Sequence, residues 1–103
     1  MIYDVAALFP AEETYGLRSQ ITRAAVSVPA NIAEGQARST AKDFANFLSM
    51  ARSSLMETDT LLRVAVRRRY VTEASASNAL FLIVEVSKMI VALRNKVRPE
   101  RNA

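Results

Sequence analysis

Apolar residues recur at helical spacing in four segments of the chain, and short polar stretches separate these segments. The first segment is brief: Ile2, Val5, Ala6 and Phe9 follow the i, i+3, i+4, i+7 pattern of one helix face. Pro10 comes next and disfavours the helical conformation at Phe9. The pattern therefore predicts a first helix that is very short and ends at about Phe9.

The second segment predicts a helix from about Tyr15 to about Gly35, with Thr14 as its N-cap. Its apolar face repeats every three or four residues, at Leu17, Ile21, Ala24, Val28 and Ile32. The third segment predicts a helix that begins after Thr40, its N-cap, and runs to about Arg68, which is roughly 40 Å at 1.5 Å per residue. Its main apolar stripe consists of Phe44, Leu48, Ala51, Leu55, Leu62 and Val66.

The fourth predicted helix begins after Thr72 and is apolar around most of its circumference. Its only acidic residues are Glu73 and Glu85, and residues 81–84 and 89–93 are entirely apolar. A helix without a polar face is buried on more than one side, and a chain of 103 residues offers little to bury it with. Three long helices and one short helix also leave a groove uncovered, so the pattern predicts self-association.

Together the four segments predict an all-α fold, an antiparallel four-helix bundle with a short first helix and three long helices. The length of 103 residues fits one domain. We place this domain at residues 1–98, followed by a flexible C-terminal tail at residues 99–103. Two glycines and three prolines are too few turn residues for an all-β sandwich, and they exclude a glycine-rich phosphate loop.

Composition argues against catalysis. The chain has no cysteine and no histidine, so it lacks a thiolate nucleophile, the commonest general base and the commonest zinc ligands. We therefore predict that the protein is not an enzyme, and that it has no catalytic residues, no metal site and no cofactor.

The charge of the chain is basic and unevenly distributed. Fourteen Lys and Arg against ten Asp and Glu give a net charge of +4. Residues 1–51 have a net charge of −1, whereas residues 52–103 have a net charge of +5. A basic half of this kind suits an anionic partner such as nucleic acid, and it is also typical of the solvated surface of a helix.

Two basic clusters are candidates for contacts with nucleic acid. Arg67, Arg68 and Arg69 at the end of the third helix offer bidentate phosphate contacts, and the following tyrosine offers a ring for base stacking. The same arginines could instead stabilise a helix C-terminus. Lys96 and Arg98 form a second candidate cluster, and antiparallel helices would place it at the opposite end of the protomer.

A polar stripe lies beside the apolar face of the second helix, with residues of the third helix expected to face it. Two carboxylates, Glu34 and Glu57, could in principle perform acid–base chemistry or hold a cation. We favour a structural interpretation, in which a partly buried polar network fixes the register of the two helices and Arg23 neutralises the carboxylates. The predicted network consists of Gln20, Arg23, Asn31, Glu34 and Glu57.

No targeting or membrane segment is evident. The N-terminus lacks the basic and long apolar regions of a signal peptide. The longest apolar stretch, Ala79 to Val84, is far shorter than the ~20 residues that span a bilayer. We therefore expect no membrane contact and a cytoplasmic location.

The sequence resembles a known family between about residues 9 and 70. The resemblance is carried by residues 15–20 (YGLRSQ), by residues 23–35 (RAAVSVPANIAEG), and by Phe44, Phe47, Leu48, Ala51, Ser54, Glu57 and Tyr70. These match the four-helix bundle protein family, also known as the intervening-sequence proteins of bacterial large-subunit ribosomal RNA genes. Members usually have a longer first helix with a Trp-containing segment, of which only residues 2–9 remain here.

The resemblance implies a bacterial, cytosolic four-helix bundle that assembles into a ring, typically a homopentamer. Relatives include the accessory variability proteins of diversity-generating retroelements, which are basic rings that bind a reverse transcriptase and nucleic acid. The implied partners are thus further copies of the chain, RNA or DNA, and a protein such as a reverse transcriptase.

Two functions remain open at this point. The first is a non-enzymatic, homo-oligomeric adaptor or scaffold that associates with nucleic acid. The alternative is a structural protein–protein interaction module that binds no nucleic acid. Convergence of the basic clusters on one surface of the ring would favour the first function, whereas scattered cations paired with acids would favour the second.

Overall fold

The computed structural model describes residues 1–13 and 16–98, and within these ranges it contains helices and no strands. The helices are α1 (Ile2–Ala6), the short 3-10 helix η1 (Ala11–Glu13), α2 (Leu17–Gln36), α3 (Ala41–Arg67) and α4 (Glu73–Val97). The predicted all-helical fold with a short first helix and three long helices is confirmed. The predicted tail at residues 99–103 lies outside the described residues.

The threonines that precede α3 and α4 cap these helices. The Thr40 hydroxyl accepts the backbone N–H of Asp43 at 3.1 Å, and the Thr72 hydroxyl accepts that of Ser75 at 3.0 Å. These bonds satisfy donors that a helix N-terminus otherwise leaves unpaired. Both sequence-predicted N-caps are confirmed.

Helix α2 begins differently from the sequence prediction. Its N-cap is Gly16, and Thr14, the predicted N-cap, lies outside the described residues. The backbone N–H of Leu17 is instead bound by the carboxylate of Glu13, at 3.0 Å. A longer side chain in η1 therefore performs the role that the prediction gave to Thr14, because Glu13 lies four residues before the first helical N–H.

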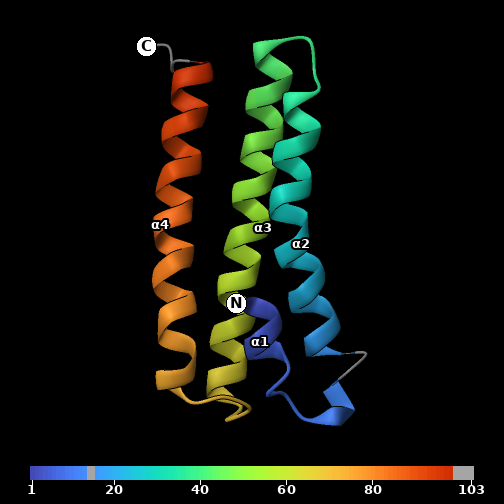
Figure 1. Cartoon of the computed structure of the whole chain (residues 1–103), viewed down its shortest axis with the longest axis vertical. Coiled ribbons are helices and arrows are strands. Elements are labelled where there is room, and N and C mark those ends of the chain that lie inside the picture. Colours follow the sequence, from blue (N-terminus) through green and yellow to red (C-terminus); the bar gives the residue numbers. More distant parts are fainter. Residues whose placement is uncertain (14–15, 99–103) are drawn as a thin grey trace.

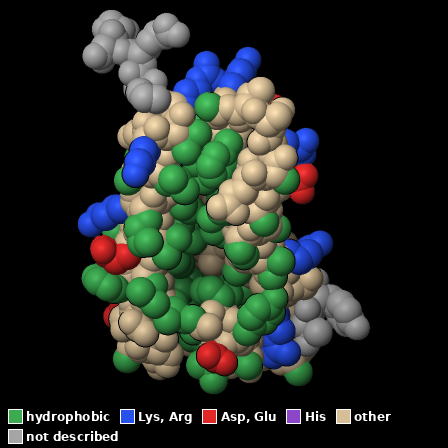
Figure 2. Space-filling model, turned by 45° about the horizontal axis from the view of Figure 1, so that its top comes forward, with side chains coloured by type: hydrophobic (Ala, Val, Ile, Leu, Met, Phe, Trp, Pro, Cys, Tyr) green, Lys and Arg blue, Asp and Glu red, His purple; other side chains and the backbone are tan. Residues whose placement is uncertain are grey.

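Helix α3 is the centre of the bundle (Figure 1). Helix α2 packs antiparallel along one side of α3, and α4 packs antiparallel along another, so that α4 contacts α3 and the stub α1 but does not reach α2. Helix α1 lies between α2 and α4 only at the end where the chain begins (Figure 1). Above it, hydrophobic side chains gather along a hollow between the helices (Figure 2).

The core follows the predicted stripes. Its most deeply buried large side chains are Ile21, Leu48, Leu62 and Thr58. Thr58 is the one buried polar residue within the described ranges, and its hydroxyl donates to the backbone oxygen of Ser54 at 2.9 Å. This bond satisfies the hydroxyl, so its burial leaves no polar group unpaired.

Helix α4 keeps much of its apolar surface outside the core. Phe81 is 61% exposed and Met89 is 67% exposed, while Ala76, Ala79, Ile83 and Ile90 face the core. Within the described residues, α4 is also the one helix long and apolar enough to cross a membrane by length and composition. Because an apolar helix of a bundle passes the same test, the expectation of no membrane contact stays a prediction. The exposed apolar face needs a cover of some kind.

Gly35 lies in the last turn of α2, where the helix approaches α3 closely. A Cβ atom added there would lie 2.7 Å from the Cβ of Phe47 and 2.9 Å from a ring carbon of Phe44. Both values are shorter than ordinary carbon–carbon contacts. The glycine therefore sets the spacing between α2 and α3 near the loop that joins them.

We predict that Gly35→Ala destabilises the protein by about 1–3 kcal/mol, because overpacking outweighs the gain of about 1 kcal/mol in helix propensity. Thermal unfolding measures the effect. Gln36→Ala, one residue further along and exposed, provides the control and should change stability by less than about 0.5 kcal/mol. A Gly35→Ala variant that melts above the wild type would show that the two helices are not in close contact here.

Candidate nucleic-acid interface

The first basic cluster surrounds the turn that ends α3. The backbone N–H of Tyr70 bonds to the oxygen of Ala65 at 2.9 Å, and that of Arg69 to the oxygen of Val66 at 3.0 Å. This pair of bonds is a Schellman motif, which places Arg69 in the left-handed conformation at φ 62°. Glycine usually occupies this position, because a side chain there costs about 1–2 kcal/mol. Arg69 is thus held in a strained backbone conformation while its side chain is exposed.

Arg68 of this cluster and Tyr70, which follows the cluster, are engaged in contacts within the chain. The guanidinium of Arg68 lies 5.3 Å from the centre of the Tyr70 ring, and its Nε donates to the Tyr70 hydroxyl at 3.0 Å. The Tyr70 hydroxyl donates in turn to the Glu13 carboxylate at 2.8 Å, and its ring packs against Phe9 at 5.9 Å. Tyr70 therefore fastens the N-terminal segment to the α3–α4 turn, and its ring is not a free platform for base stacking.

The same contacts shift the titration of both groups. The bond from the Leu17 backbone N–H, followed by the bond from the Tyr70 hydroxyl, lowers the pKa of Glu13. The bond to Glu13 raises the pKa of Tyr70, because it stabilises the protonated hydroxyl.

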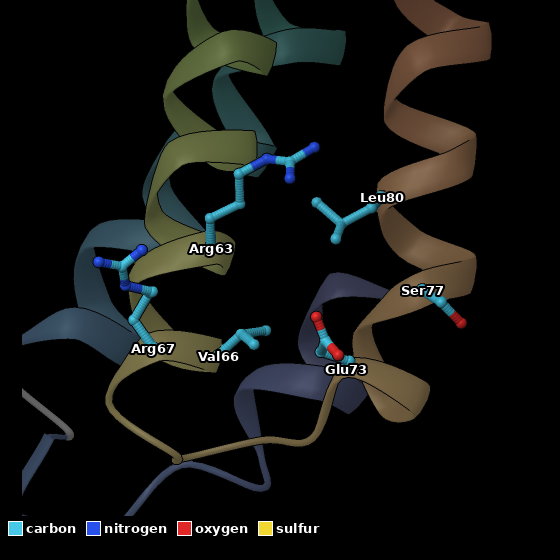
Figure 3. Close-up of a pocket in the computed structure, with 6 residues that line it drawn as sticks. All are labelled: Arg63, Val66, Arg67, Glu73, Ser77 and Leu80. Atoms are coloured by element: carbon cyan, nitrogen blue, oxygen red, sulfur yellow. The ribbon is translucent and has the colours of Figure 1, made fainter.

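Arg67 lies at the edge of a cleft of about 360 Å³ between the end of α3 and the start of α4. Figure 3 shows Arg63 reaching across this cleft toward Leu80 of α4, while the side chain of Arg67 is directed away from α4. Arg63 is paired with Asp59 at 2.7 Å, and Glu73 of α4 also lines the cleft. Carboxylates therefore accompany the arginines at this end of the molecule.

The second candidate cluster, Lys96 and Arg98, lies at the other end of the bundle. Lys96 is in the last turn of α4 and Arg98 is its C-cap, and both side chains are exposed. Because α3 and α4 are antiparallel and the molecule is 45 Å long, this cluster and residues 67–69 are far apart within one protomer (Figure 1).

Charge is separated along the long axis. The half formed by residues 27–54 and 86–98 contains seven Lys and Arg but two Asp and Glu, a net charge of +5. The half formed by residues 1–26 and 55–85 contains six basic and seven acidic residues, a net charge of −1. Figure 2 shows Lys and Arg side chains at the top of the molecule, where the ends of α2 and α4 meet the start of α3. We call the half formed by residues 27–54 and 86–98 the basic half.

The polar network predicted from the sequence is formed only in part. The hydroxyls of Ser27 and Ser54 join α2 to α3 at 2.8 Å, and the Asn31 amide donates to the Ser27 hydroxyl at 2.9 Å. Glu34, however, is exposed and pairs at 2.8 Å with Arg38, which lies in the turn that follows α2. The prediction that Glu34 belongs to the partly buried network is wrong, because Glu34 pairs with a cation four residues later in the turn after α2.

The remaining members of the predicted network line a shallow cleft. Gln20, Arg23 and Glu57 are exposed and surround a space of about 420 Å³ between α2 and α3, beside Ser27 and Ser54. Arg23 donates to the backbone oxygen of Ser19 at 3.4 Å. The predicted neutralisation of buried carboxylates by Arg23 is therefore incorrect. Within residues 1–13 and 16–98, no three acidic side chains come together in a way that could hold a metal ion.

Sequence reasoning missed a third cleft, between the first half of α3 and the last turns of α4. It has a volume of about 460 Å³ and is lined by Ser49, Arg52, Ser53, Val91, Arg94 and Asn95. The signal was present in the sequence: residues 49, 52 and 53 and residues 91, 94 and 95 both follow the i, i+3, i+4 spacing of one helix face. We call this site the α3–α4 cleft.

These features define a small helical bundle with one basic end and an incompletely covered apolar surface. The family model described as 23S rRNA-intervening sequence protein matches residues 1–92, and the chain belongs to this family. The match confirms the resemblance seen in the sequence and extends it across most of α4. No curated protein matches the chain.

We predict that Glu13→Gln reduces the acid sensitivity of the protein. A carboxyl whose pKa is lower in the folded chain stabilises the fold above its unfolded pKa, near 4.5, and this contribution disappears as pH falls through the folded pKa. Melting temperatures from about pH 6 to about pH 3 should therefore fall less steeply in the variant than in the wild type. Glu12→Gln removes the same charge next to Glu13 while keeping both hydrogen bonds. Parallel pH curves for wild type and Glu13→Gln would contradict this role.

Proposed function

We propose that the protein is a non-enzymatic, self-associating adaptor that holds nucleic acid against its basic half. The observation that carries this proposal is the separation of charge, with +5 in the basic half and −1 in the rest of the molecule. Of the seven cations there, Arg38 and Lys88 are paired with carboxylates. The others leave a positive surface at one end, which attracts a polyanion.

The expected mode of binding is electrostatic. Lysines and arginines that neutralise phosphates release condensed counterions, so affinity falls steeply as salt concentration rises. Side chains at the ends of helices reach the phosphate backbone and not the edges of the bases, so little sequence preference is expected. RNA and DNA are both candidate partners on this basis.

Self-association is the second part of the proposal. The exposed apolar face of α4 and the hollow above α1 leave hydrophobic surface that a monomer rarely keeps. A closed ring, a homopentamer as the resemblance implies, would cover it through two different faces of each protomer. Such a ring would also repeat the basic half around its axis and raise the local positive charge.

A protein–protein interaction module without nucleic-acid binding is the competing function. The apolar face of α4 supports it, because the same surface fits a foreign helix as well as a second copy. A protein partner such as a reverse transcriptase remains a proposal under either function. The two functions differ in whether the wild-type protein binds a short RNA at low salt.

We predict that the basic half dominates RNA binding. Lys96→Ala with Arg98→Ala removes two charges there, while Arg67→Ala with Arg69→Gly removes two at the other end and relieves the positive φ of Arg69. The first pair should weaken binding of a short RNA more than the second and flatten its salt dependence by roughly 0.7 per lost phosphate contact. Fluorescence anisotropy across a salt series measures both quantities.

Two outcomes of this experiment count against the proposal. If the wild type does not bind RNA at low salt, the interaction module without nucleic acid is the better function. If binding survives at about 0.5 M salt, the interaction is not the electrostatic one proposed here.

We predict that the protein is an oligomer held together by α4. Light scattering of the wild type should give a multiple of the 11.4 kDa chain mass. Phe81→Ser with Met89→Ser replaces the two most exposed large hydrophobic side chains of α4 by hydroxyl groups and should shift the mass toward the monomer. Lys88→Ala, on the same exposed side, is the matched control and should leave the oligomer intact. A wild-type mass near 11.4 kDa would contradict the prediction.

A further inference from the structure

The α3–α4 cleft is distinct from both basic clusters that the sequence indicated. It lies inside the basic half, where the antiparallel packing of α3 and α4 brings residues 49–53 opposite residues 91–95. Each helix contributes three lining residues at i, i+3, i+4 spacing, so the two helices form its two walls.

The chemistry of its lining residues points to an anion. Five of the six lining side chains carry hydrogen-bond donors: two arginines, two serines and one asparagine. No carboxylate lines it. In the two other clefts described above, a glutamate accompanies the arginines, Glu73 in one and Glu57 in the other. Of these three clefts, only the α3–α4 cleft offers positive charge without an acidic neighbour in its lining.

One of the two arginines is already oriented. The Nε of Arg94 donates to the hydroxyl of Ser49 at 2.7 Å across the two helices, and Arg94 is half-buried. This bond uses one donor and leaves the terminal amino groups of the guanidinium for a ligand. Because the side chain is partly fixed before binding, less rotamer entropy is lost when a ligand arrives.

Arg52 supplies the second guanidinium and is uncommitted. Its side chain is exposed and forms no ion pair or hydrogen bond with any residue in the described part of the chain. A guanidinium presents a planar fork of donors that matches two oxygens of a phosphate, which an ammonium does not. Two such forks on facing helices suit a ligand with several phosphate oxygens.

We infer that the α3–α4 cleft binds a phosphodiester of a nucleic-acid backbone, with Arg52 and Arg94 as its ligands. This inference rests on the proposed function, and it assigns the principal phosphate contact to residues other than 67–69, 96 and 98. The cleft is open to solvent, so a phosphate within a continuous strand can enter it while the strand continues over the neighbouring basic surface.

The test compares charge-matched variants with short oligouridine as the probe. Arg52→Ala with Arg94→Ala removes both cleft arginines, whereas Arg38→Ala with Lys88→Ala removes two cations of the same half that are paired with carboxylates. The cleft pair should weaken binding at least about tenfold and reduce the salt slope by roughly 0.7, the value for one lost phosphate contact. The control pair should weaken binding less than about threefold. Circular dichroism melting confirms that both variants are folded.

A third variant separates orientation from charge. Ser49→Ala leaves the net charge unchanged and removes the bond that fixes Arg94. It should weaken oligouridine binding about two- to fivefold while the salt slope stays at the wild-type value, because the number of phosphate contacts is unchanged. If binding depended on general electrostatic attraction alone, Ser49→Ala would leave the affinity for oligouridine unchanged, because the net charge stays the same.

Other outcomes of these experiments test the cleft site, the proposed function and the identity of the ligand. Equal losses for the cleft pair and the control pair would overturn the cleft site while leaving the proposed function intact. Absence of wild-type binding to oligouridine would overturn both. Inorganic phosphate that competes as well as the oligomer at equal phosphate concentration would make free phosphate the ligand, and oligoglutamate that binds in its place would make the ligand an acidic protein. Either result would overturn the inference.

Discussion

Helices α2 and α4 pack against two different sides of α3, and this arrangement determines most of what the molecule can do. Because α2 and α4 both pack against α3, five of its side chains are almost completely buried: Ala45, Leu48, Ala51, Leu62 and Ala65. The backbones of α2 and α4 stay apart, and α1 lies between them at one end of the molecule only. The apolar surface left on α4 is a direct consequence of this arrangement. The self-association proposed above would cover the surface that this core arrangement leaves exposed.

The same antiparallel packing explains where the charge lies. It brings the C-terminal ends of α2 and α4 to one end of the molecule, beside the start of α3. Cations are favoured near helix C-termini by the partial negative charge there, by about 0.3–1 kcal/mol each. Arg94 and Lys96 in the last turn of α4 therefore have a structural reason to be basic, apart from any ligand. The α3–α4 cleft does not share this explanation in full, because Arg52 lies in the middle of α3, far from either end of its helix.

The sequence predicted the helices well and the side-chain contacts less well, for a physical reason. Helical periodicity and the caps at Thr40 and Thr72 are local signals, so the three long helices could be placed within a few residues. Whether Glu34 turns toward α3 or pairs with Arg38 depends on rotamers and on the rotation of the helix, which periodicity does not fix. Gly35 marked the end of α2 in the sequence, but the structure uses it for close packing against Phe47. The sequence does not predict the α3–α4 cleft, because its two halves are about 40 residues apart and periodicity does not show which helix faces pack together.

The polar cleft and the apolar face meet at the end of α4, and this links assembly to binding. Val91 belongs to both: it is 37% exposed, and it lines the cleft beside Arg94. A second copy seated on α4 would therefore form part of the wall around the two arginines and exclude water from one side. Interactions between charged groups strengthen as the surrounding dielectric falls, so a phosphate held there would be bound more tightly in the assembly than by a separate protomer. By linkage, nucleic acid bound in the cleft would stabilise the assembly to the same extent.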